Sequence, residues 1–430
     1  MTVIVVGAGI AGLTVARNLS RSKVHTVVLE AQDRVGGRVY TKNGHDFGAS
    51  WIHDLQNNAF FPVAVELKLR LAYDQHFFFF SRGAPLSPYT VDRAFKLLGG
   101  VARAPLNQTL HEYAVAVTRG LPEEEARELQ GVMRTVEHWT GMSWDEMSAQ
   151  SAEMPHASPD AFNLSGNERF VSWIRDEIDW DYCDLRLEAP VARIAGGAGG
   201  GAGGGGAYTV TTEAGDTVTG SHVVCTIPVG ALKTPGLFSL DLPAPLRHAI
   251  ADSVMACLGK VFLRFADRWW DSVPDRMEVF GRSVDAVSPE TVRPGDQPVF
   301  FTNVHKFTDE PVLVALTASP LTERVEAHPE EAFQLLGPAL AQLRTDKTAA
   351  VPEPISVEVT NWSQNRFFNG SYSGLAAGQD EETVYGPFFT GHNGLRFAGE
   401  HATDDAVGTM HAAYVTGERE AARVLKMLGR

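Results

Sequence analysis

The sequence is poor in cysteine, and the cysteines are scattered. Cys183, Cys225 and Cys257 are the only 3 in 430 residues, and no two of them have CxxC spacing. A disulfide framework and a structural zinc site are therefore not expected. The HExxH pattern of zinc peptidases is also missing. We expect no metal centre.

Positive charge and long apolar runs are scarce as well. The chain has 52 acidic and 37 basic residues, a net charge of −15, which argues against nucleic acid as a partner and is compatible with a cationic substrate. No run is apolar enough to span a membrane. A first strand beginning by Val3 leaves no room for a signal peptide, and the ending VLKMLGR is no peroxisomal or lipidation signal. We expect a soluble, intracellular, cytoplasmic protein without a membrane partner, monomeric or dimeric.

A nucleotide-binding pattern opens the chain. The order strand, glycine turn, helix, strand is predicted for residues 3–29. Gly7, Gly9 and Gly12 form GxGxxG: Gly7 for the tight turn, Gly9 for backbone approach to a pyrophosphate, Gly12 for close helix–strand packing. Glu30 ends the second strand, where a carboxylate would accept ribose hydroxyls. These residues predict a dinucleotide site for FAD or NAD.

The next residues favour FAD. Gly36, Gly37 and Arg38 form a Gly-Gly-Arg turn directly after Glu30. Such a turn brings backbone and a guanidinium to a pyrophosphate or flavin, which a nicotinamide enzyme does not need. Taken alone, Arg38 would be a surface turn residue.

The length indicates two domains or one large composite, because 430 residues exceed one ordinary core. The glycine tract 195–207 lies between two strand-like runs and predicts a flexible hairpin tip, not a domain boundary. Further elements are predicted along the chain: strand runs at 185–194 and 207–215, helices within 121–147, a buried strand at 221–228, a short strand at 395–400 and an amphipathic helix at 409–428.

The run VMACLGKVFLRF, residues 254–265, predicts one β-strand with Lys260 in its middle. Period-two alternation places Leu258, Lys260, Phe262 and Arg264 on one face. On pattern alone this face is partly solvated. The alternative is a lysine directed into a closed apolar site, where its amine could hold a proton or a water.

Several motifs in a fixed order give the chain a family resemblance. They are GGR, DFGASWIHD, CLGKVFLRF, NWSQNRFFNGSYSG, LRFAGEHA and GTMHAAYVTGEREAARVL, with HWTGMSWDEMSA as a supporting patch. With them the sequence resembles the flavin-containing amine oxidases, most of all the polyamine and spermine oxidases. The resemblance runs from Val3 to about Leu428 and is looser in the middle.

The resemblance implies an α/β (α+β composite) fold. It consists of a glutathione-reductase-like, FAD-binding Rossmann domain and a discontinuous substrate domain of mixed sheet and helices. We expect the FAD-binding domain at residues 1–72, 165–258 and 380–430, and the substrate-binding domain at 73–164 and 259–379.

The resemblance also implies the cofactor contacts. The ADP half of FAD would contact Gly7, Gly9, Gly12, Glu30, Gly37 and Arg38, and the backbone of Val191 would meet adenine. The isoalloxazine would lie against Gly48, Ala49, Ser50 and Trp51. Glu400 matches an acid near the ribityl and pyrophosphate, although alone it could be a solvated loop acid. Gly408, Thr409 and Met410 open a last helix whose N-terminus would stabilise charge on reduced flavin.

Five residues would form the catalytic site. Lys260 matches the lysine whose amine holds a water at flavin N5, so we favour the functional interpretation for it. Trp362 and Tyr372 would frame the flavin, although unaided both would be core aromatics. Thr409 falls where some relatives have a second aromatic residue. His53 matches a histidine of the substrate channel in polyamine oxidases; a lone histidine is otherwise more often structural.

Two departures from the family matter. Relatives that bind long polyamines often carry acidic residues just after the segment aligned with Phe77–Phe80, where this chain has Ser81 and Arg82. The four phenylalanines themselves are more typical of a core than of a channel. Monoamine oxidases attach FAD through a C-terminal cysteine, whereas no cysteine follows Cys257 here. We expect non-covalent FAD.

The expected reaction is oxidation of a C–N bond in a polyamine such as spermine, spermidine or an acetylated form. Water hydrolyses the resulting imine to an aldehyde and a shorter amine, and O2 is reduced to hydrogen peroxide. The alternatives are oxidation of another amine (a monoamine, a long-chain amine, or an amino acid bound through Arg82 or Arg366), a lysine-demethylase-like activity, and a redox-silent FAD-binding protein.

Overall fold

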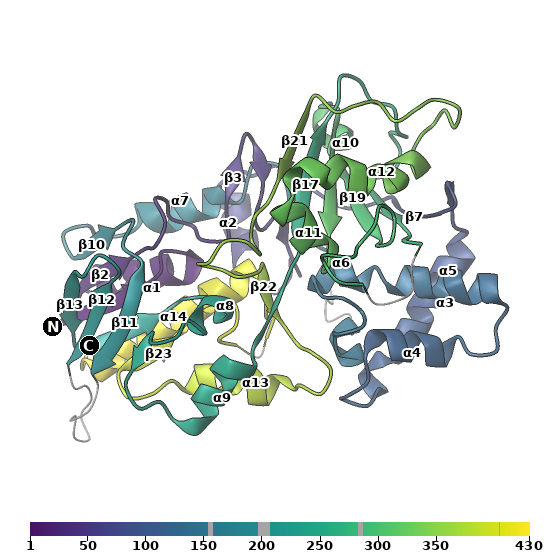
Figure 1. Ribbon diagram of the computed structural model, residues 1–430. Coiled ribbons are helices and arrows are strands. Elements are labelled where there is room, and N and C mark those ends of the chain that lie inside the picture. The colour runs from purple at the N-terminus through teal and green to yellow at the C-terminus, as the bar shows by residue number, and fades with distance from the viewer. Residues whose placement is uncertain (154–157, 197–206, 283–286, 404) are drawn as a thin grey trace. The chain divides into compact units, whose positions relative to one another are not determined.

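The computed structural model describes residues 1–153, 158–196, 207–282, 287–403 and 405–430. Contacts divide the chain into two compact units (Figure 1). Unit 1 is Met1–Leu71, Ser158–Val254 and Asp380–Arg430, and unit 2 is Ala72–Ala157 and Met255–Gln379. Each unit is thus assembled from separate stretches of the sequence.

A parallel five-stranded sheet forms the centre of unit 1, in the order β10-β2-β1-β14-β23. Its strands are valine-rich and largely buried, as parallel strands covered on both faces require. They are β1 (Thr2–Val6), β2 (His25–Leu29), β10 (Cys183–Arg186), β14 (His222–Cys225) and β23 (Leu395–Phe397).

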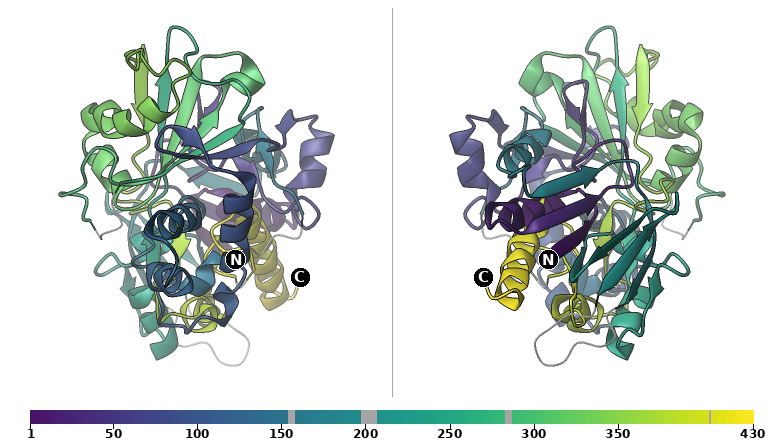
Figure 2. Two further views of the ribbon diagram at one scale, coloured as in Figure 1. Left: turned by 90° about the vertical axis from the view of Figure 1, so that its right-hand side faces the viewer. Right: turned by 90° about the vertical axis from the view of Figure 1, so that its left-hand side faces the viewer.

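Helices from both ends of the chain cover one face of this sheet. The views in Figure 2 show α14 (Met410–Met427) beside α1 (Ile10–Arg21), and a Cβ built on Gly417 would lie 2.7 Å from the Ala11 carbonyl oxygen. Glycine at this position therefore allows the close approach of the two helices. The remaining helices of unit 1 are α2 (Phe60–Glu66), α7 (Glu168–Asp176), α8 (Val229–Leu232), α9 (Ala244–Asp252) and α13 (Glu381–Thr390).

A second sheet of unit 1 has the order β13-β12-β11-β15. Its strands are β11 (Val191–Gly196), β12 (Tyr208–Thr212), β13 (Thr217–Gly220) and β15 (Phe238–Ser239). β11 and β12 pair antiparallel, and most of the glycine tract between them (197–206), with its predicted flexible tip, lies outside the described residues. Five short strands are β3 (Thr41–Lys42), β4 (His45–Asp46), β5 (Trp51–Ile52), β9 (Ala161–Asn163) and, at the unit boundary, β6 (Leu71–Ala72).

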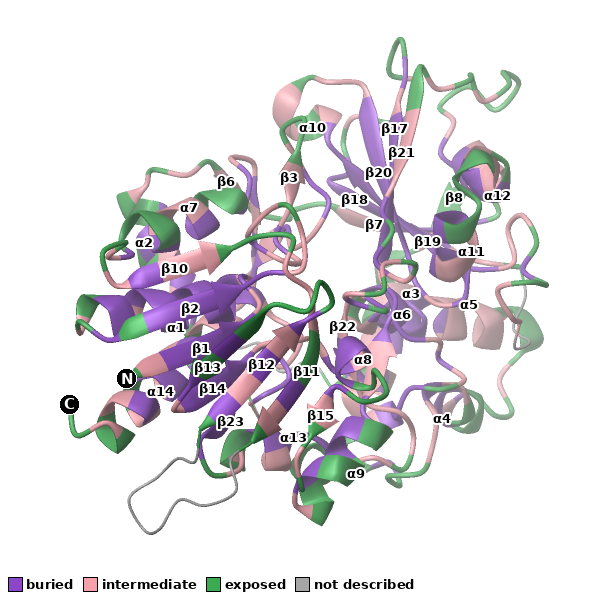
Figure 3. Cartoon of the chain, turned by 60° about the vertical axis from the view of Figure 1, so that its left-hand side comes forward, coloured by how far each residue is buried: buried purple, intermediate pink, exposed green. Residues whose placement is uncertain are grey.

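Unit 2 is built on a mixed seven-stranded sheet, in the order β21-β17-β20-β19-β18-β7-β8. In Figure 3 its middle strands are mostly buried. The strands are β7 (Phe77–Ser81), β8 (Ala84–Pro85), β17 (Gly259–Arg264), β18 (Arg276–Val279), β19 (Val299–Asn303), β20 (Val312–Thr317) and β21 (Ser356–Val359). Its helices are α3 (Pro88–Leu98), α4 (Leu110–Val117), α5 (Glu123–Met133), α6 (Val136–Thr140), α10 (His305–Thr308), α11 (Leu321–Ala327) and α12 (Ala332–Gln342), with 3-10 turns η1 (Val101–Arg103), η2 (Ala149–Ala152) and η3 (Pro329–Glu331).

The register of this sheet separates two faces. Lys260 pairs with Leu316, which pairs with Phe300, and Phe300 pairs with Glu278, so these residues share one face. Their sequence neighbours, among them Val261, lie on the other face in a hydrophobic core that includes residues of α12. Lys260 therefore faces away from the main apolar core of unit 2.

The structure confirms the predicted α/β class, with an N-terminal parallel sheet and additional mixed sheets. Two strand predictions were wrong. The run 254–265 is two strands in different sheets, β16 (Val254–Ala256), which pairs with β22 (Tyr372–Gly374), and β17. The chain breaks there because Cys257 N–H donates to the carbonyl of Gly141 and Leu258 N–H donates to the Ser371 hydroxyl.

The run 185–194 also belongs to two sheets. Its first residues end β10 in the parallel sheet, and its last residues begin β11 in the antiparallel sheet. Glu188 has φ +53°, in the left-handed region, and turns the chain between the two strands. The apolar pattern alone could not reveal this turn. In the part of the chain that the structure describes, no helix has the length and apolar character to cross a membrane.

Candidate functional site

The glycine turn between β1 and α1 has the geometry of a tight strand-to-helix connection. Gly7 has φ +103°, a conformation that L side chains rarely adopt. A Cβ on Gly12 would lie 1.9 Å from the Gly7 carbonyl oxygen, so the first helical turn packs directly on the loop. Gly7 and Gly12 are thus required by the protein backbone itself.

Gly9 differs from its two neighbours. Its φ of −72° is open to any residue, and a Cβ there would meet Gly37 Cα at 3.9 Å and Gly36 oxygen at 4.0 Å, which are ordinary contacts. Gly9 is the N-cap of α1, and no described side chain caps it. No steric contact within the protein therefore requires glycine here, whereas a pyrophosphate on the free N–H groups of the helix would exclude a side chain. The residues fit the phosphate part of FAD.

Glu30 lies beside this turn and is 5% exposed. Its carboxylate accepts from Ala8 N–H at 2.6 Å and from Gln32 N–H at 2.9 Å. Burial raises the pKa of Glu30, and these hydrogen bonds oppose the rise. The Glu30 carbonyl accepts from Ala189 N–H at 2.8 Å, two residues before Val191, so the segment of Val191 runs beside Glu30. The structure thus brings both predicted positions together.

A second group of predicted residues is joined through Arg38. Its guanidinium donates to Glu400 Oε1 at 2.8 Å, and Glu400 Oε2 accepts from Gly408 N–H at 3.0 Å. Glu400 is 4% exposed, so its interpretation as a solvated loop acid is wrong. The Arg38 carbonyl accepts from Ala49 N–H at 3.2 Å, and a Cβ on Gly48 would overlap that carbonyl. These hydrogen bonds bring the GGR turn, the GASW segment and the start of α14 together within unit 1.

Ser50 and Trp51 continue the GASW segment into β5. The Ser50 hydroxyl lies 3.3 Å from the carbonyl oxygens of Asp46 and Gly48, and the Trp51 ring packs edge-on against Phe162 at 5.1 Å. The segment is thus fixed by contacts within unit 1.

Thr409 is the N-cap of α14. Its hydroxyl accepts from Ala412 N–H at 3.2 Å and donates to the Ala406 carbonyl at 2.7 Å. Both interactions stabilise the helix start, directly before Met410, the first residue of α14, which is buried. The hydroxyl of Thr409 therefore has a structural role that the sequence comparison did not indicate.

His401, next to Glu400, was missed by the sequence analysis. It is fully buried, and neither ring nitrogen has a hydrogen-bond partner among the described residues. Its ring packs edge-on against Phe388 with centroids 5.0 Å apart. Burial lowers the pKa of the imidazole to about 4. A neutral histidine thus lies directly beside the Arg38–Glu400 pair.

His53 of unit 1 has an acidic partner that the sequence did not reveal. His53 Nδ1 lies 2.7 Å from Asp160 Oδ2, and Asp160 Oδ1 accepts from Asp54 N–H at 2.9 Å. Both side chains are about one-third exposed. The two residues are 107 positions apart, so no local spacing could have connected them.

In unit 2, Lys260 is 6% exposed, which excludes the solvated-face interpretation for this residue. Its N–H donates to the Thr360 hydroxyl at 2.9 Å, and its carbonyl accepts from Thr360 N–H at 3.0 Å. Thr360 is two residues before Trp362, which is buried and packs edge-on against Phe368 at 5.3 Å. Lys260 and the segment of Trp362 are therefore brought together.

Tyr372 belongs to the same region of unit 2. It begins β22, and its hydroxyl donates to the Trp139 carbonyl at 2.9 Å. The neighbouring Ser371 hydroxyl accepts from Leu258 N–H, two residues before Lys260. Lys260, Trp362 and Tyr372 thus lie on segments joined by hydrogen bonds that involve the Thr360 and Ser371 hydroxyls. His53, Thr409 and the cofactor-binding candidates other than Trp362 belong to unit 1.

The four phenylalanines of β7 are divided between the two sheet faces. Phe78 and Phe80 belong to the hydrophobic core of unit 2. Phe79 pairs in register with Glu278, on the face of Lys260, and stacks with Phe77 at 4.5 Å. Phe79 and Phe80 are buried, as expected for core residues, whereas Phe77 and Phe78 are half-buried, and Phe77 and Phe79 stack on the face of Lys260.

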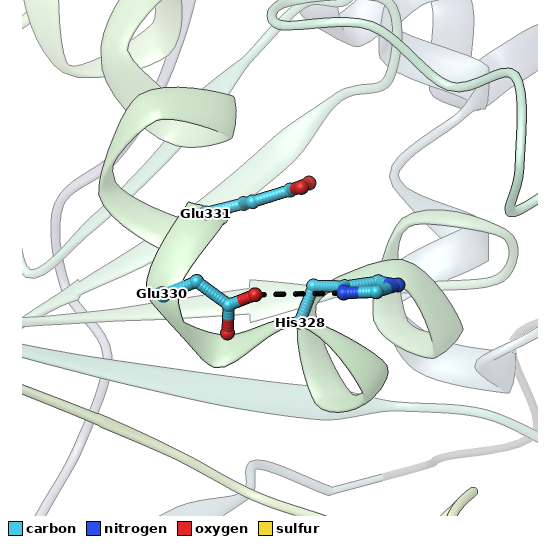
Figure 4. A group of neighbouring side chains, drawn as sticks. All are labelled: His328, Glu330 and Glu331. Atoms are coloured by element: carbon cyan, nitrogen blue, oxygen red, sulfur yellow. Dashed lines mark ion pairs between the residues drawn. The ribbon is translucent and has the colours of Figure 1, made fainter.

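One cluster has the residue types of a metal site. His328, Glu330 and Glu331 bring ligand atoms within 4.8 Å of one another (Figure 4). However, Glu331 already accepts from Arg324 Nε at 2.8 Å, and Glu330 is exposed. The positive charge of Arg324 beside the Glu331 carboxylate would weaken the binding of a cation. We therefore do not assign a metal centre to this cluster.

Comparison with known proteins agrees with these features. Residues 137–425 match the family described as "Flavin containing amine oxidoreductase", and residues 5–67 match "NAD(P)-binding Rossmann-like domain". Polyamine oxidase 4 of Oryza sativa subsp. japonica is 30% identical, over 97% of this chain and 87% of its own length. Corticosteroid-binding protein of Candida albicans is 27% identical, over 96% of this chain and 94% of its own length.

A third relative, Lysine-specific histone demethylase 1 homolog 2 of Arabidopsis thaliana, is 30% identical over 99% of this chain but only 58% of its own length. The match to the family covers well over half of the chain, and it includes Lys260, Trp362, Tyr372 and Glu400. The chain therefore belongs to the flavin-containing amine oxidoreductase family.

Proposed function

We propose that this protein is an FAD-dependent amine oxidase that acts on polyamines, with O2 as electron acceptor. Family membership and the 30% identity with Polyamine oxidase 4 support the reaction class. The net charge of −15 favours a cationic substrate. The observation that carries the proposal is Lys260, a lysine buried to 6% exposure beside the segment of Trp362.

Unit 1 is the FAD-binding domain in this proposal, and unit 2 is the substrate-binding domain. The open N-terminus of α1 at Gly9 would hold the pyrophosphate, and Glu30 would accept ribose hydroxyls. Arg38 and Glu400 would lie near the phosphates and ribityl chain. When bound, FAD accepts a hydride equivalent from the carbon next to the amine nitrogen.

The side chains of this chain prepare the amine. A protonated amine does not readily release hydride, so the site must favour the neutral form. A buried aromatic and aliphatic environment does this, since desolvation disfavours an ammonium ion. Trp362 and Tyr372 would frame the reacting centre, and the Lys260 amine would hold the water that takes part in proton transfer. His53, oriented by Asp160, would line the route of the substrate.

The net reaction balances without a further reactant. The amine R–CH2–NH–R′ loses two electrons and two protons to give the imine R–CH=N–R′. Water then splits the imine into the aldehyde R–CHO and the amine R′–NH2. O2 takes up the two electrons and two protons as hydrogen peroxide.

A peroxide-coupled screen of polyamines, monoamines and amino acids tests this function. We expect higher kcat/KM for oligoamines with secondary nitrogens than for benzylamine. Equal or better kcat/KM for an aromatic monoamine would contradict the polyamine assignment. Acid precipitation should leave yellow FAD in the supernatant, and colour in the pellet would contradict non-covalent binding.

The same screen addresses the alternatives. An amino-acid oxidase needs a cation for the carboxylate, but Arg82 is paired with Glu124 at 2.6 Å at the surface, and Arg366 is exposed and stacks on Phe367. A protein that keeps FAD without turnover would give no peroxide with any amine. Methylated lysine peptides, added to the screen, test a demethylase-like activity, which would require them to exceed free polyamines in kcat/KM.

A further inference from the structure

Glu326 of unit 2 is a buried carboxylate. It lies near the end of α11 and is 5% exposed. The donors that bond it among the described residues are neutral, and burial raises the pKa of its carboxyl group. A carboxylate is costly to bury unless hydrogen-bond donors replace water. The identity of these donors indicates what the residue does.

Among the described residues, the hydrogen bonds to the Glu326 carboxylate come from one short segment, residues 360–363. The Thr360 hydroxyl donates to Oε1 at 2.6 Å, and Ser363 donates through its N–H and its hydroxyl to Oε2, both at 2.6 Å. The backbone of Trp362 contributes as well. These are short, charge-assisted hydrogen bonds. They hold the backbone on both sides of Trp362.

Thr360 extends this connection to Lys260. Its hydroxyl accepts from Lys260 N–H at 2.9 Å while it donates to Glu326, and its own N–H donates to the Lys260 carbonyl at 3.0 Å. One carboxylate on α11 thus fixes the segment of Trp362 and, through one hydroxyl, the backbone of Lys260. The arrangement lies entirely within unit 2.

We propose that Glu326 is a positioning residue for the oxidation, which aligns Lys260 and Trp362 through Thr360 and Ser363. This inference rests on the proposed function, because it assumes that Lys260 and Trp362 serve the flavin reaction. Small displacements of catalytic groups have large kinetic effects: an error of about 1 Å can cost roughly 100-fold in rate.

Glu323 offers a matched control three residues earlier on the same helix. It is also a largely buried carboxyl group, and burial raises its pKa. However, its Oε1 accepts from the Ser319 hydroxyl at 2.8 Å, and it has no hydrogen bond to segment 360–363 among the described residues. Glu323 lies beside the Cys257 thiol instead. Glu323→Gln therefore makes the same chemical change in the same helix and leaves the hydrogen bonds of segment 360–363 in place.

The first measurement is hydrogen exchange of the FAD-loaded proteins. In Glu326→Gln, the amides of residues 260 and 360–363 should exchange about 10-fold faster or more, because the amide side chain cannot accept from both sides. In Glu323→Gln these amides should keep their parent rates. Equal exchange in the two variants would overturn the proposal. If Glu326→Gln does not fold, Thr360→Val breaks the same connection, with Thr360→Ser as the variant that should restore it.

The second measurement is anaerobic flavin reduction in a cycle of parent, Glu326→Gln, Lys260→Met and the double variant. Glu326→Gln should slow reduction about 10- to 100-fold, and it should add little in the Lys260→Met background, because coupled residues are non-additive. Fully multiplicative effects would mean that Glu326 only stabilises the fold, and would overturn the proposal.

The two hypotheses can fail separately. If no amine reduces the parent flavin, the proposed function fails. The cycle is then run on reoxidation by O2 after photochemical reduction, and hydrogen exchange still decides whether Glu326 holds Lys260 and segment 360–363. Unchanged exchange or multiplicative reoxidation rates in that case would overturn the positioning role alone.

Discussion

The two units hold their candidate residues in different ways. In unit 1, the glycine turn and the GGR turn meet through backbone groups, at the bridge between Gly9 and Gly36, and the side-chain pair Arg38–Glu400 then joins the start of α14 to them. In unit 2, Lys260 acquires its surroundings from side chains up to 100 residues away, such as Thr360. Local sequence motifs predict the conformation of the backbone. They do not predict which side chains from distant segments contact one another. The following substitutions test this difference.

Lys260→Met should have the largest effect. Methionine keeps the apolar stem in β17, so the fold and the FAD content should survive. Loss of one positioned proton-transfer group should slow turnover about 10²- to 10⁴-fold. Stopped-flow measurement of anaerobic reduction and of reoxidation assigns the loss to one half-reaction.

The control for this substitution is Arg264→Met on the same strand and face. Arg264 is half-buried, pairs with Glu310 at 2.7 Å, and lies opposite Ser356, at the end of β21 remote from Thr360. Its replacement should leave both half-reactions unchanged. If Lys260→Met matched Arg264→Met in both steps, the functional interpretation of Lys260 would be wrong.

The second effect concerns the buried His401 of unit 1. Because its pKa is lowered to about 4, the neutral ring contributes stability that is fully present above about pH 6.5 and is lost as the pH falls toward 4. The loss corresponds to about 3 kcal/mol. His401→Gln keeps a polar side chain without a titration, so its free energy of unfolding should fall less over this pH range. Urea titrations of both proteins at a series of pH values from 7 to 4 measure the free energy of unfolding. An identical dependence of this free energy on pH in the two proteins would contradict the prediction.

The third test separates the glycines of the turn. Gly12→Ala places a Cβ against the Gly7 carbonyl and should lower the free energy of unfolding by about 1–3 kcal/mol or more, even without FAD. Gly9→Ala meets only ordinary contacts, so the apoprotein should keep its stability. Its affinity for FAD should nevertheless fall. Denaturant unfolding of the apoproteins and FAD titration measure both effects. Unchanged FAD affinity in Gly9→Ala would argue against a pyrophosphate at this position.

The same contrast explains what could be predicted from the sequence. The strands and helix around GxGxxG followed from spacing, because Gly7 and Gly12 encode a backbone conformation within a few residues. The run at 254–265 gave a wrong strand prediction, because its apolar pattern continues through Cys257 and Leu258. The N–H groups of these two residues donate hydrogen bonds to Gly141 and Ser371, which are far away in sequence. Asp160, Glu326 and His401 have no local signal, because their roles arise only when separate segments meet.

The smallest effect is expected at the partly exposed His53–Asp160 pair. In Asp160→Asn the amide oxygen can still accept from Asp54 N–H, but an NH2 group then faces His53 Nδ1, which must accept instead of donate. Pairs with this exposure are worth about 1 kcal/mol or less, so kcat/KM for a triamine should fall roughly 5-fold at most. The fall should appear in KM more than in kcat if His53 lines the substrate route.

Asp145→Asn provides the comparison, because Asp145 lies 2.7 Å from His111 Nδ1 in unit 2 with similar exposure, and neither residue is among the site candidates. Its kinetic constants should equal those of the parent. If kcat/KM fell equally in both variants, these histidine–aspartate pairs would affect activity only through the stability of the fold. A loss confined to Asp160→Asn would show that a substrate contact in unit 1 depends on a long-range side-chain partner, so that the division between local motifs and distant networks runs through unit 1 as well.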